Sequence, residues 1–222
     1  MRKFLLGFCI ILIFVVACTQ KQAVPTTTTP QPAPKVQETK SIDPAQIISP
    51  KPVISDEVKQ LFDKSSKVKS IYYKYKGPET ADFFHEFYIK GDKIKYRPGR
   101  DLKSLDNPES YDVIYIDKAL ATAKSYCDAA YCTVKGKKTD LNYNNFYIRT
   151  PMDWMNGLEK ADRIGEEVID DRKTWKLDTE RGQMWIDTFY GIPLKVISNG
   201  QTYRFQQISI NGVTDADVTP SS

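Results

Sequence analysis

The sequence predicts a mainly β domain, a curved antiparallel half-barrel sheet of roughly ten strands with short covering helices. Apolar residues recur with a period of two through most of the chain after residue 67, and turn-forming residues separate these runs at close spacing. A parallel connection needs about a dozen residues, and the connections here are shorter. Sequential strands therefore pair in antiparallel fashion, and a long, strongly twisted sheet tends to curl.

A first short helix is expected where the folded part begins. Ser55 and Asp56 can cap its N-terminus, and Val58, Leu61 and Phe62 follow with the spacing of one helix face.

The strands are recognised by alternating apolar residues and by the turns between them. Gly91-Asp92 and Asn199-Gly200 are hairpin turns, and the second is a strong hairpin signal. Strands are expected at 68–76, 81–90, 93–97, 112–117, 120–127, 163–170, 173–180, 183–188, 194–198 and 202–210.

A second short helix is expected over Pro151–Leu158. Thr150 can cap it, Pro151 suits its first turn, and Gly157 lies near its end. Residues 133–150, just before it, have no clear pattern.

The N-terminus has the pattern of an export signal. The apolar run Phe4–Ala17 has 14 residues, whereas a membrane span needs about 20, so it fits a signal-peptide core. The run ends in Val15-Val16-Ala17-Cys18, which resembles the lipobox of secreted lipoproteins. That resemblance implies cleavage after Ala17 and lipidation of Cys18. An uncleaved anchor is the alternative.

A proline- and threonine-rich stalk follows the cysteine. Seven of the chain's 13 prolines lie between Thr19 and Val53, and such a segment cannot bury enough apolar surface to fold. We therefore expect a signal peptide at 1–17, a lipidated cysteine and stalk at 18–53, and one folded domain at 54–222. This organisation predicts an extracytoplasmic protein anchored to a membrane, at the cell surface or on the periplasmic face.

Charge argues against nucleic acid as a partner. Six of the 32 basic residues but only two of the 28 acidic residues precede residue 54, so the folded part has 26 of each. A neutral domain lacks the basic surface that phosphate backbones require.

Two cysteines remain in the folded part, Cys127 and Cys132. Outside the cytoplasm such a pair is most simply a disulfide. A zinc site needs about four ligands, and a redox motif places two residues between its cysteines rather than four.

The residues provide little for catalysis. His85 is the only histidine, and no Gly-x-Ser-x-Gly motif or Gly-rich phosphate loop is present. Glu166-Glu167 and Asp170-Asp171 are pairs of adjacent carboxylates. Neighbouring residues on a strand point to opposite faces, so neither pair can converge as a general acid and base. We expect no enzyme activity, no cofactor and no metal.

Aromatic residues are concentrated in the folded part, which has 23 of the chain's 26. Such a sheet either packs two layers tightly or curls around an apolar cavity. The segment 152–158 can act as a flexible lid over that cavity, or simply cap the core. Candidate ligand-binding residues are Phe83, Phe87, Met152, Trp154, Met155, Ile186, Tyr203 and Phe205.

A family resemblance is clearest over residues 151–211. The unit Trp185-Ile186-Asp187 followed by Gly191-Ile192-Pro193-Leu194-Lys195 resembles the second half of the outer-membrane lipoprotein carriers (LolA-like proteins), and Pro151–Leu158 resembles their preceding helix. The resemblance implies a half-barrel closed by helices over an apolar cavity that accepts acyl chains. It also implies a buried arginine that holds the lid, and no arginine here can be matched to it.

Together these observations predict a membrane-anchored envelope lipoprotein whose domain binds lipid or another apolar ligand, as a carrier, chaperone or sensor. Its expected partners are the membrane through Cys18, an acyl-chain ligand and other envelope lipoproteins. The alternative is a non-enzymatic protein-interaction module with the same fold and a filled core.

Overall fold

The computed structural model describes residues 54–81, 83–99, 110–130 and 132–220. All of them belong to one compact unit, Ser49–Ser222. The expected signal peptide, Cys18 and the stalk lie outside the described residues. Among the described helices, none has the length and apolar character needed to cross a bilayer.

The predicted fold class is confirmed. Eleven strands form a single open antiparallel sheet that does not close into a barrel, and the helices are few and short. The strands are β1 (Ser70–Lys76), β2 (His85–Lys90), β3 (Lys93–Arg97), β4 (Val113–Asp117), β5 (Thr122–Tyr126), β6 (Lys138–Leu141), β7 (Ala161–Ile169), β8 (Arg172–Thr179), β9 (Gly182–Asp187), β10 (Pro193–Ser198) and β11 (Gln201–Ile210). The helices are α1 (Asp56–Asp63), α2 (Tyr143–Phe146) and α3 (Pro151–Met155), with 3₁₀ turns at Lys64–Lys67, Pro78–Thr80 and Ala216–Val218.

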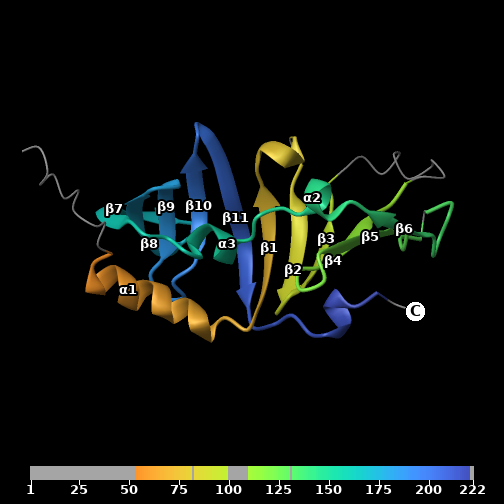
Figure 1. The fold of residues 1–222 in the computed structure, drawn as a ribbon, viewed down its shortest axis with the longest axis horizontal. Coiled ribbons are helices and arrows are strands. Elements are labelled where there is room, and N and C mark those ends of the chain that lie inside the picture. The colour runs from red at the N-terminus through yellow and green to blue at the C-terminus, as the bar shows by residue number, and fades with distance from the viewer. Residues whose placement is uncertain (1–53, 82, 100–109, 131, 221–222) are drawn as a thin grey trace, which may run out of the picture. The chain divides into compact units, whose positions relative to one another are not determined.

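The strand order places two consecutive strands at opposite edges of the sheet. It runs β6-β5-β4-β3-β2-β1-β11-β10-β9-β8-β7, because β1 pairs with β11. The chain must therefore cross the whole sheet between β6 and β7. Residues 142–160 make this crossing and contain α2 and α3 (Figure 1). We call this segment the strap.

The hairpin turns confirm the turn signals in the sequence. Asn199 and Gly200 have φ of 50° and 75°, and Asp170 and Asp171 have φ of 48° and 60°. Positive φ at both central residues is the geometry of a type I′ turn, whose twist matches that of the flanking strands. These turns fix the register of β7 with β8 and of β10 with β11.

Helix α1 begins where the sequence predicts and packs close to the β9–β10 connection. The Ser55 hydroxyl accepts a hydrogen bond from the Val58 amide, and Val58 and Leu61 are buried. Gly191 has φ of 67°, and a Cβ there would lie 2.1 Å from the carbonyl oxygen of Leu61. This glycine therefore allows the helix to approach the sheet.

The structure differs from the expected elements in three places. Strand β6 and helix α2 were not predicted and lie in the segment without a clear pattern. Strand β6 is exposed and has no alternating apolar residues that could have indicated it. Strand β2 begins at His85 rather than at residue 81, since a 3₁₀ turn at Pro78–Thr80 precedes it. Helix α3 ends at Met155, where the Asn156 amide donates to the Met152 carbonyl and Gly157 has φ of 71°.

The main core lies between one face of the sheet and the segments that cover it. It includes Val58 and Leu61 of α1 and Trp154 of α3. A second, smaller cluster contains Ile169, Trp185 and Leu194. Met184 and Ile186 belong to the first cluster and Trp185 to the second, because successive residues of β9 point to opposite faces.

Candidate functional site

Three aromatic rings form a ladder across the inner face of β1, β2 and β3. Tyr73 pairs with Phe87 across strands, and Phe87 pairs with Tyr96. The ring centroids are 5.1 Å and 4.9 Å apart, with interplanar angles of 2° and 12°. The strand register therefore builds a continuous apolar surface, because directly opposite side chains on one face lie in contact.

Two more rings extend this surface over β1 and β11. Tyr75 pairs with Phe205 across strands, with ring centroids 5.6 Å apart. The Phe205 ring also meets the edge of the Tyr73 ring at 5.4 Å. All of these side chains are buried. We call Tyr73, Tyr75, Phe87, Tyr96 and Phe205 the aromatic face.

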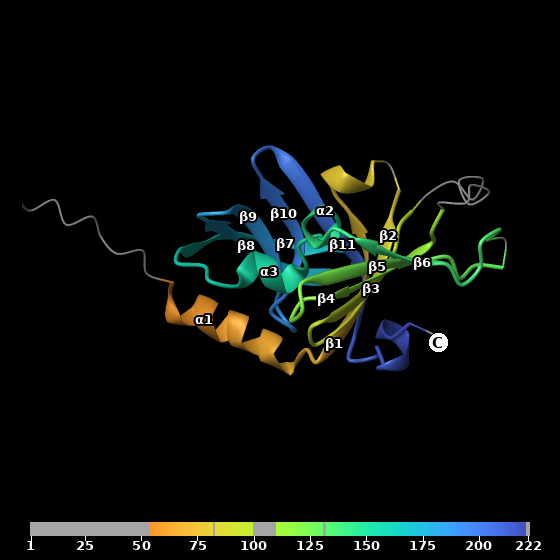
Figure 2. The same cartoon turned by 45° about the vertical axis from the view of Figure 1, so that its right-hand side comes forward.

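The strap covers this part of the sheet, and α2 and α3 lie in front of the central strands in both views (Figures 1 and 2). Trp154 of α3 is 3% exposed, and its ring lies 4.7 Å from that of Tyr203 on β11. At the other end of the strap, the Tyr96 hydroxyl donates to the Phe146 carbonyl at 3.2 Å. The strap therefore contacts the sheet through the ring of Tyr203, beside the aromatic face, and through the hydroxyl of Tyr96, which belongs to it.

Asp153 is the polar centre of the strap. Its carboxylate accepts hydrogen bonds from Lys118 Nζ at 2.8 Å, Tyr147 Oη at 2.5 Å and the Thr150 amide at 2.8 Å. Burial alone would raise the pKa of Asp153, but these hydrogen bonds outweigh it and lower the pKa below its usual value. For Tyr147, burial and the bond to Asp153 both raise the pKa.

Arg181 holds the end of α3 from the turn between β8 and β9. Its Nη1 donates to the carbonyl oxygens of Asp153 at 3.0 Å and Trp154 at 3.2 Å, and its Nη2 donates to that of Gly157 at 3.3 Å. The last carbonyls of a helix have no partner within the helix, and a cation there is favourable. No sequence pattern predicts this contact, because the residues are far apart along the chain.

Seven of the eight predicted ligand-binding residues meet in the main core. Phe87, Trp154, Ile186 and Phe205 are buried in it, and Met152, Met155 and Tyr203 are half-buried against it. The structure therefore brings these seven residues together.

Phe83 is the exception, and the prediction that its side chain points inward is wrong. It precedes β2, its amide donates to the Thr80 carbonyl in a turn, and its side chain is 48% exposed. The alternation that places Phe87 inward therefore does not extend back to Phe83.

Two buried polar atoms at this interface have no hydrogen-bond partner among the described residues. They are the hydroxyl of Tyr73, on the sheet, and the indole Nε1 of Trp154, on the strap. Tyr73 is fully buried. Buried donors are usually satisfied, so such exceptions need an explanation.

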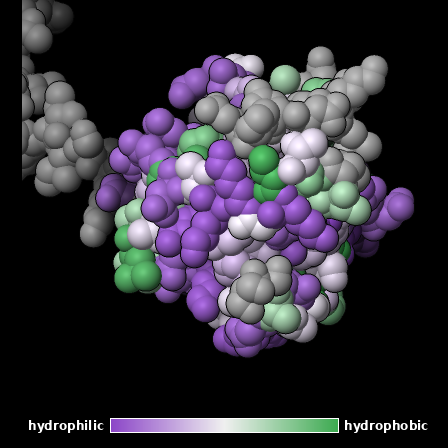
Figure 3. All heavy atoms as spheres, turned by 90° about the vertical axis from the view of Figure 1, so that its right-hand side faces the viewer, coloured by the Kyte–Doolittle hydropathy of each residue, from purple (hydrophilic) through white to green (hydrophobic). Residues whose placement is uncertain are grey.

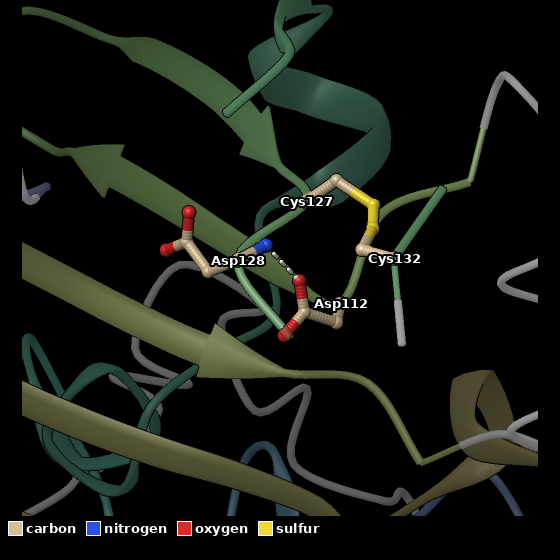
Figure 4. The surroundings of a disulfide bond; sticks show 4 residues. All are labelled: Asp112, Cys127, Asp128 and Cys132. Carbon is tan, nitrogen blue, oxygen red and sulfur yellow. Dashed lines mark hydrogen bonds between the residues drawn. A yellow bond between two sulfur atoms is a disulfide. The ribbon is translucent and has the colours of Figure 1, made fainter. Parts of the chain in front are cut away.

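Cys127 and Cys132 are distant along the chain from the residues of the aromatic face, and the bond between them closes a small loop. Figure 4 shows the disulfide between Cys127 and Cys132, whose α-carbons are 5.9 Å apart, within the usual range of about 4.4–6.8 Å. Both cysteines lie in the β5–β6 connection, and Cys127 directly follows the last residue of β5. The carboxylate of Asp112 lies beside it and accepts from the Asp128 amide at 2.7 Å.

Asp112 and the two cysteines also form the one group of potential metal ligands found among the described residues. Three donors are fewer than the four of a structural zinc site. Sulfurs joined in a disulfide are not thiolate ligands, so this group does not fit a zinc ion.

The fold and site define a class of protein: an open antiparallel sheet whose aromatic inner face is crossed by a helical strap. No family model matches the chain, and no curated protein matches it. Solved structures with a related arrangement include a Pseudomonas aeruginosa MucA/MucB complex, at 11% identity and a TM-score of 0.41, covering 75% of this chain and 62% of that chain. The chain thus spans less than two thirds of that relative's length.

Two further structures match more completely over their own length. A DUF1329 family protein from Desulfovibrio piger has 10% identity and a TM-score of 0.25, covering 74% of this chain and 98% of that chain. A putative outer-membrane lipoprotein-sorting protein domain from Vibrio parahaemolyticus has 9% identity and a TM-score of 0.26, covering 73% and 95%. All these TM-scores are below 0.5, so the proposals below rest on the residues of this chain.

Proposed function

We propose that the domain binds an acyl chain, or another apolar ligand of that shape, between the aromatic face and the strap. One observation carries this proposal: the aromatic face is covered by a segment that takes no part in the strand ladder. The strap can move away without breaking a single pairing of the sheet, because all eleven strands pair among themselves.

Side-chain packing and hydrogen bonds, and not strand pairing, hold the strap in place. Helix α2 has four residues and α3 has five, and isolated helices this short are unstable. The strap therefore depends for its position on the burial of Ile148 and Trp154. The hydrogen bonds of Asp153, Arg181 and Tyr96 add to this. Moving it would expose the aromatic rings to water, and an acyl chain would restore the burial at about 25 cal/mol per Å² of apolar surface.

Met152 and Met155 support an apolar ligand of variable shape. Both are half-buried against the core from the strap side. Methionine is flexible and polarisable, so it can repack around different chains.

The membrane anchor forms the second part of the proposal. The run of apolar residues, the small residue Ala17 and the following Cys18 support lipidation at Cys18. A lipid there, with the proline-rich stalk, would hold the domain near an extracytoplasmic membrane surface. Replacing Cys18 with serine is expected to abolish labelling by radioactive palmitate and to leave the precursor uncleaved. Unchanged labelling would show that Cys18 is not the lipid site.

We further propose that the domain breaks and forms no bonds. The chain has a single histidine, His85, and its ring stacks on that of Tyr96 at 5.9 Å. Its position supports a packing role rather than that of an imidazole base.

Ligand binding is tested with N-phenyl-1-naphthylamine, a neutral probe that fluoresces in apolar sites. The unit Ser49–Ser222 contains the whole main core and is used without the stalk. We expect saturable fluorescence and displacement by native lipid extract. Arg181→Ala, which loosens the strap, should speed probe release, whereas Arg204→Ala, an exposed residue 4.0 Å from Asp170, should not. Absence of saturable binding would contradict the proposal.

The interaction-module alternative has its own observation. Strand β7 is an edge strand of nine residues, and its Ile164 and Val168 are 50% and 65% exposed. Exposed strand edges can pair with a strand of another protein. The strand at the opposite edge, β6, has only four residues. Hydrophilic residues predominate on the end of the molecule seen in Figure 3. This alternative is favoured if the core is filled and the domain binds no probe but captures a partner protein. Val168→Lys should then abolish that capture.

A further inference from the structure

Two hydrogen-bond donors at the covered face have no acceptor within the part of the chain that the structure describes. The Tyr73 hydroxyl comes from the sheet and the Trp154 indole from the strap, and both side chains are at least nine-tenths buried. A buried donor without an acceptor loses its bond to water and gains nothing in return. Their positions therefore cost stability as long as the site contains only protein.

Neighbouring residues show that the fold readily provides acceptors. The Tyr75 hydroxyl donates to Glu79 at 2.6 Å, and the Tyr96 hydroxyl donates to the Phe146 carbonyl at 3.2 Å. On the second cluster, the Trp185 indole donates to Glu167 at 2.5 Å. Tyr73 and Trp154 differ from these residues because neither donor has an acceptor among the described residues.

The two donors belong to one continuous surface. The Tyr73 ring meets Phe205 at 5.4 Å, and the Trp154 ring meets Tyr203, two residues along the same strand, at 4.7 Å. The Tyr73 hydroxyl also lies within electrostatic reach of Asp153: burial first, and then the charge of Asp153, raise the pKa of Tyr73. It therefore stays a neutral donor.

We propose that Tyr73 and Trp154 donate hydrogen bonds to carbonyl oxygens of the bound ligand, so that the ligand is a neutral acyl ester or acyl amide. This inference rests on the proposed function, since it assumes that an apolar ligand enters beneath the strap. A plain hydrocarbon would leave both donors unsatisfied.

A free carboxylate fits this site less well. Asp153 has a lowered pKa and is negatively charged at neutral pH, and Lys118 is already paired with it at 2.8 Å. A second carboxylate nearby would face that charge in a buried place with only neutral donors. The site thus selects for a carbonyl oxygen without net charge.

The test compares three ligands of equal chain length on the unit Ser49–Ser222: dodecane, methyl dodecanoate and dodecanoate. Each competes with bound N-phenyl-1-naphthylamine. We expect methyl dodecanoate to compete best. One neutral hydrogen bond corresponds to roughly a three- to tenfold change in affinity. The readout is the ratio of ester affinity to dodecane affinity, which Tyr73→Phe and Trp154→Phe should each reduce by about that factor.

Tyr96→Phe is the matched control. Its hydroxyl already has an acceptor in the strap, so its loss should change the binding of both ligands equally and leave the ratio unaltered. Unliganded Tyr73→Phe should also be at least as thermally stable as the wild type, because it removes an unsatisfied donor.

The outcomes separate the two proposals. If neither the probe nor any ligand binds, the proposed function fails. If alkane and ester bind equally, if dodecanoate binds best, or if Tyr73→Phe and Trp154→Phe keep the wild-type preference, the ligand still binds but this inference is overturned. A clear loss of stability in unliganded Tyr73→Phe would also overturn it, since it would show that the hydroxyl is satisfied within the protein.

Discussion

Arg181 lies in the turn between β8 and β9, and its guanidinium donates to the carbonyl oxygen of Asp153 in the strap at 3.0 Å. The same guanidinium also reaches the Trp154 carbonyl. A turn near one edge of the sheet thereby holds the segment that crosses its inner face. The position of the strap depends on this contact more than on the strap's own helices, which have only four and five residues.

Arg181→Ala should loosen the strap without unfolding the sheet. Loss of charged hydrogen bonds to three carbonyls is expected to lower the free energy of unfolding by about 1–3 kcal/mol. Amide hydrogen exchange should rise across residues 142–158 and stay low in β1 and β2. Arg204→Ala, which removes an exposed pair, should change stability by less than about 0.5 kcal/mol. Equal exchange in the strap of wild type and Arg181→Ala would contradict this role.

Asp153 should make the strap sensitive to acid. Its folded-state pKa is lowered, so the stabilisation is present above the unfolded-state pKa, about 3.9. It is lost as the pH falls through the folded-state value. Fluorescence of Trp154 should therefore change below about pH 4, before the sheet unfolds by circular dichroism. Asp153→Asn should remove this early change. An identical acid transition in both proteins would refute the assignment.

Gly191 should tolerate no side chain. Its φ is 67° and a Cβ would lie 2.1 Å from the Leu61 carbonyl, so Gly191→Ala combines backbone strain with a clash against α1. We expect a loss of more than about 2 kcal/mol in thermal or urea unfolding. Gly200 has φ of 75° with open space around it, so Gly200→Ala should cost only about 1 kcal/mol. Similar losses in both variants would show that the approach of α1 is not limiting.

Cys127 and Cys132 should form a disulfide in protein purified without reducing agent. Closing so short a loop contributes roughly 2 kcal/mol, so reduction should lower the unfolding midpoint modestly and leave the sheet intact. Thiol titration of the denatured, unreduced protein checks this. Two reactive thiols per domain in that titration would contradict the disulfide.

The hairpins could be predicted from the sequence because their signals are local. Asn199-Gly200 and the alternating apolar residues around it determine a turn and its two strands without help from the rest of the chain. Thr150 and Pro151 likewise mark the start of α3. Strand β6 gave no such signal, since Lys138–Leu141 lies at an exposed edge and needs no apolar face.

The site was predictable only in part, because it depends on non-local pairing. Alternation placed Phe87 and Phe205 on the inner face, and both are buried there. The pairing of β1 with β11 decides that the chain must cross the sheet between β6 and β7. Only that crossing brings the carbonyl groups of α3 to Arg181, and no local sequence pattern predicts this contact. For Phe83 the prediction was wrong, because the alternation was extended to a residue that precedes the start of β2.

An acyl ligand bound between the aromatic face and the strap would lie beside Trp154. The most direct test is nuclear magnetic resonance with a nitroxide-labelled methyl dodecanoate, following the indole N–H signals. Trp154 faces the main core, whereas Trp185 belongs to the second cluster, so one chain holds both reporter and control. We predict selective, saturable broadening of the Trp154 signal together with strap amides. Broadening of Trp185 or of β7 instead, or no saturable broadening at all, would contradict the account.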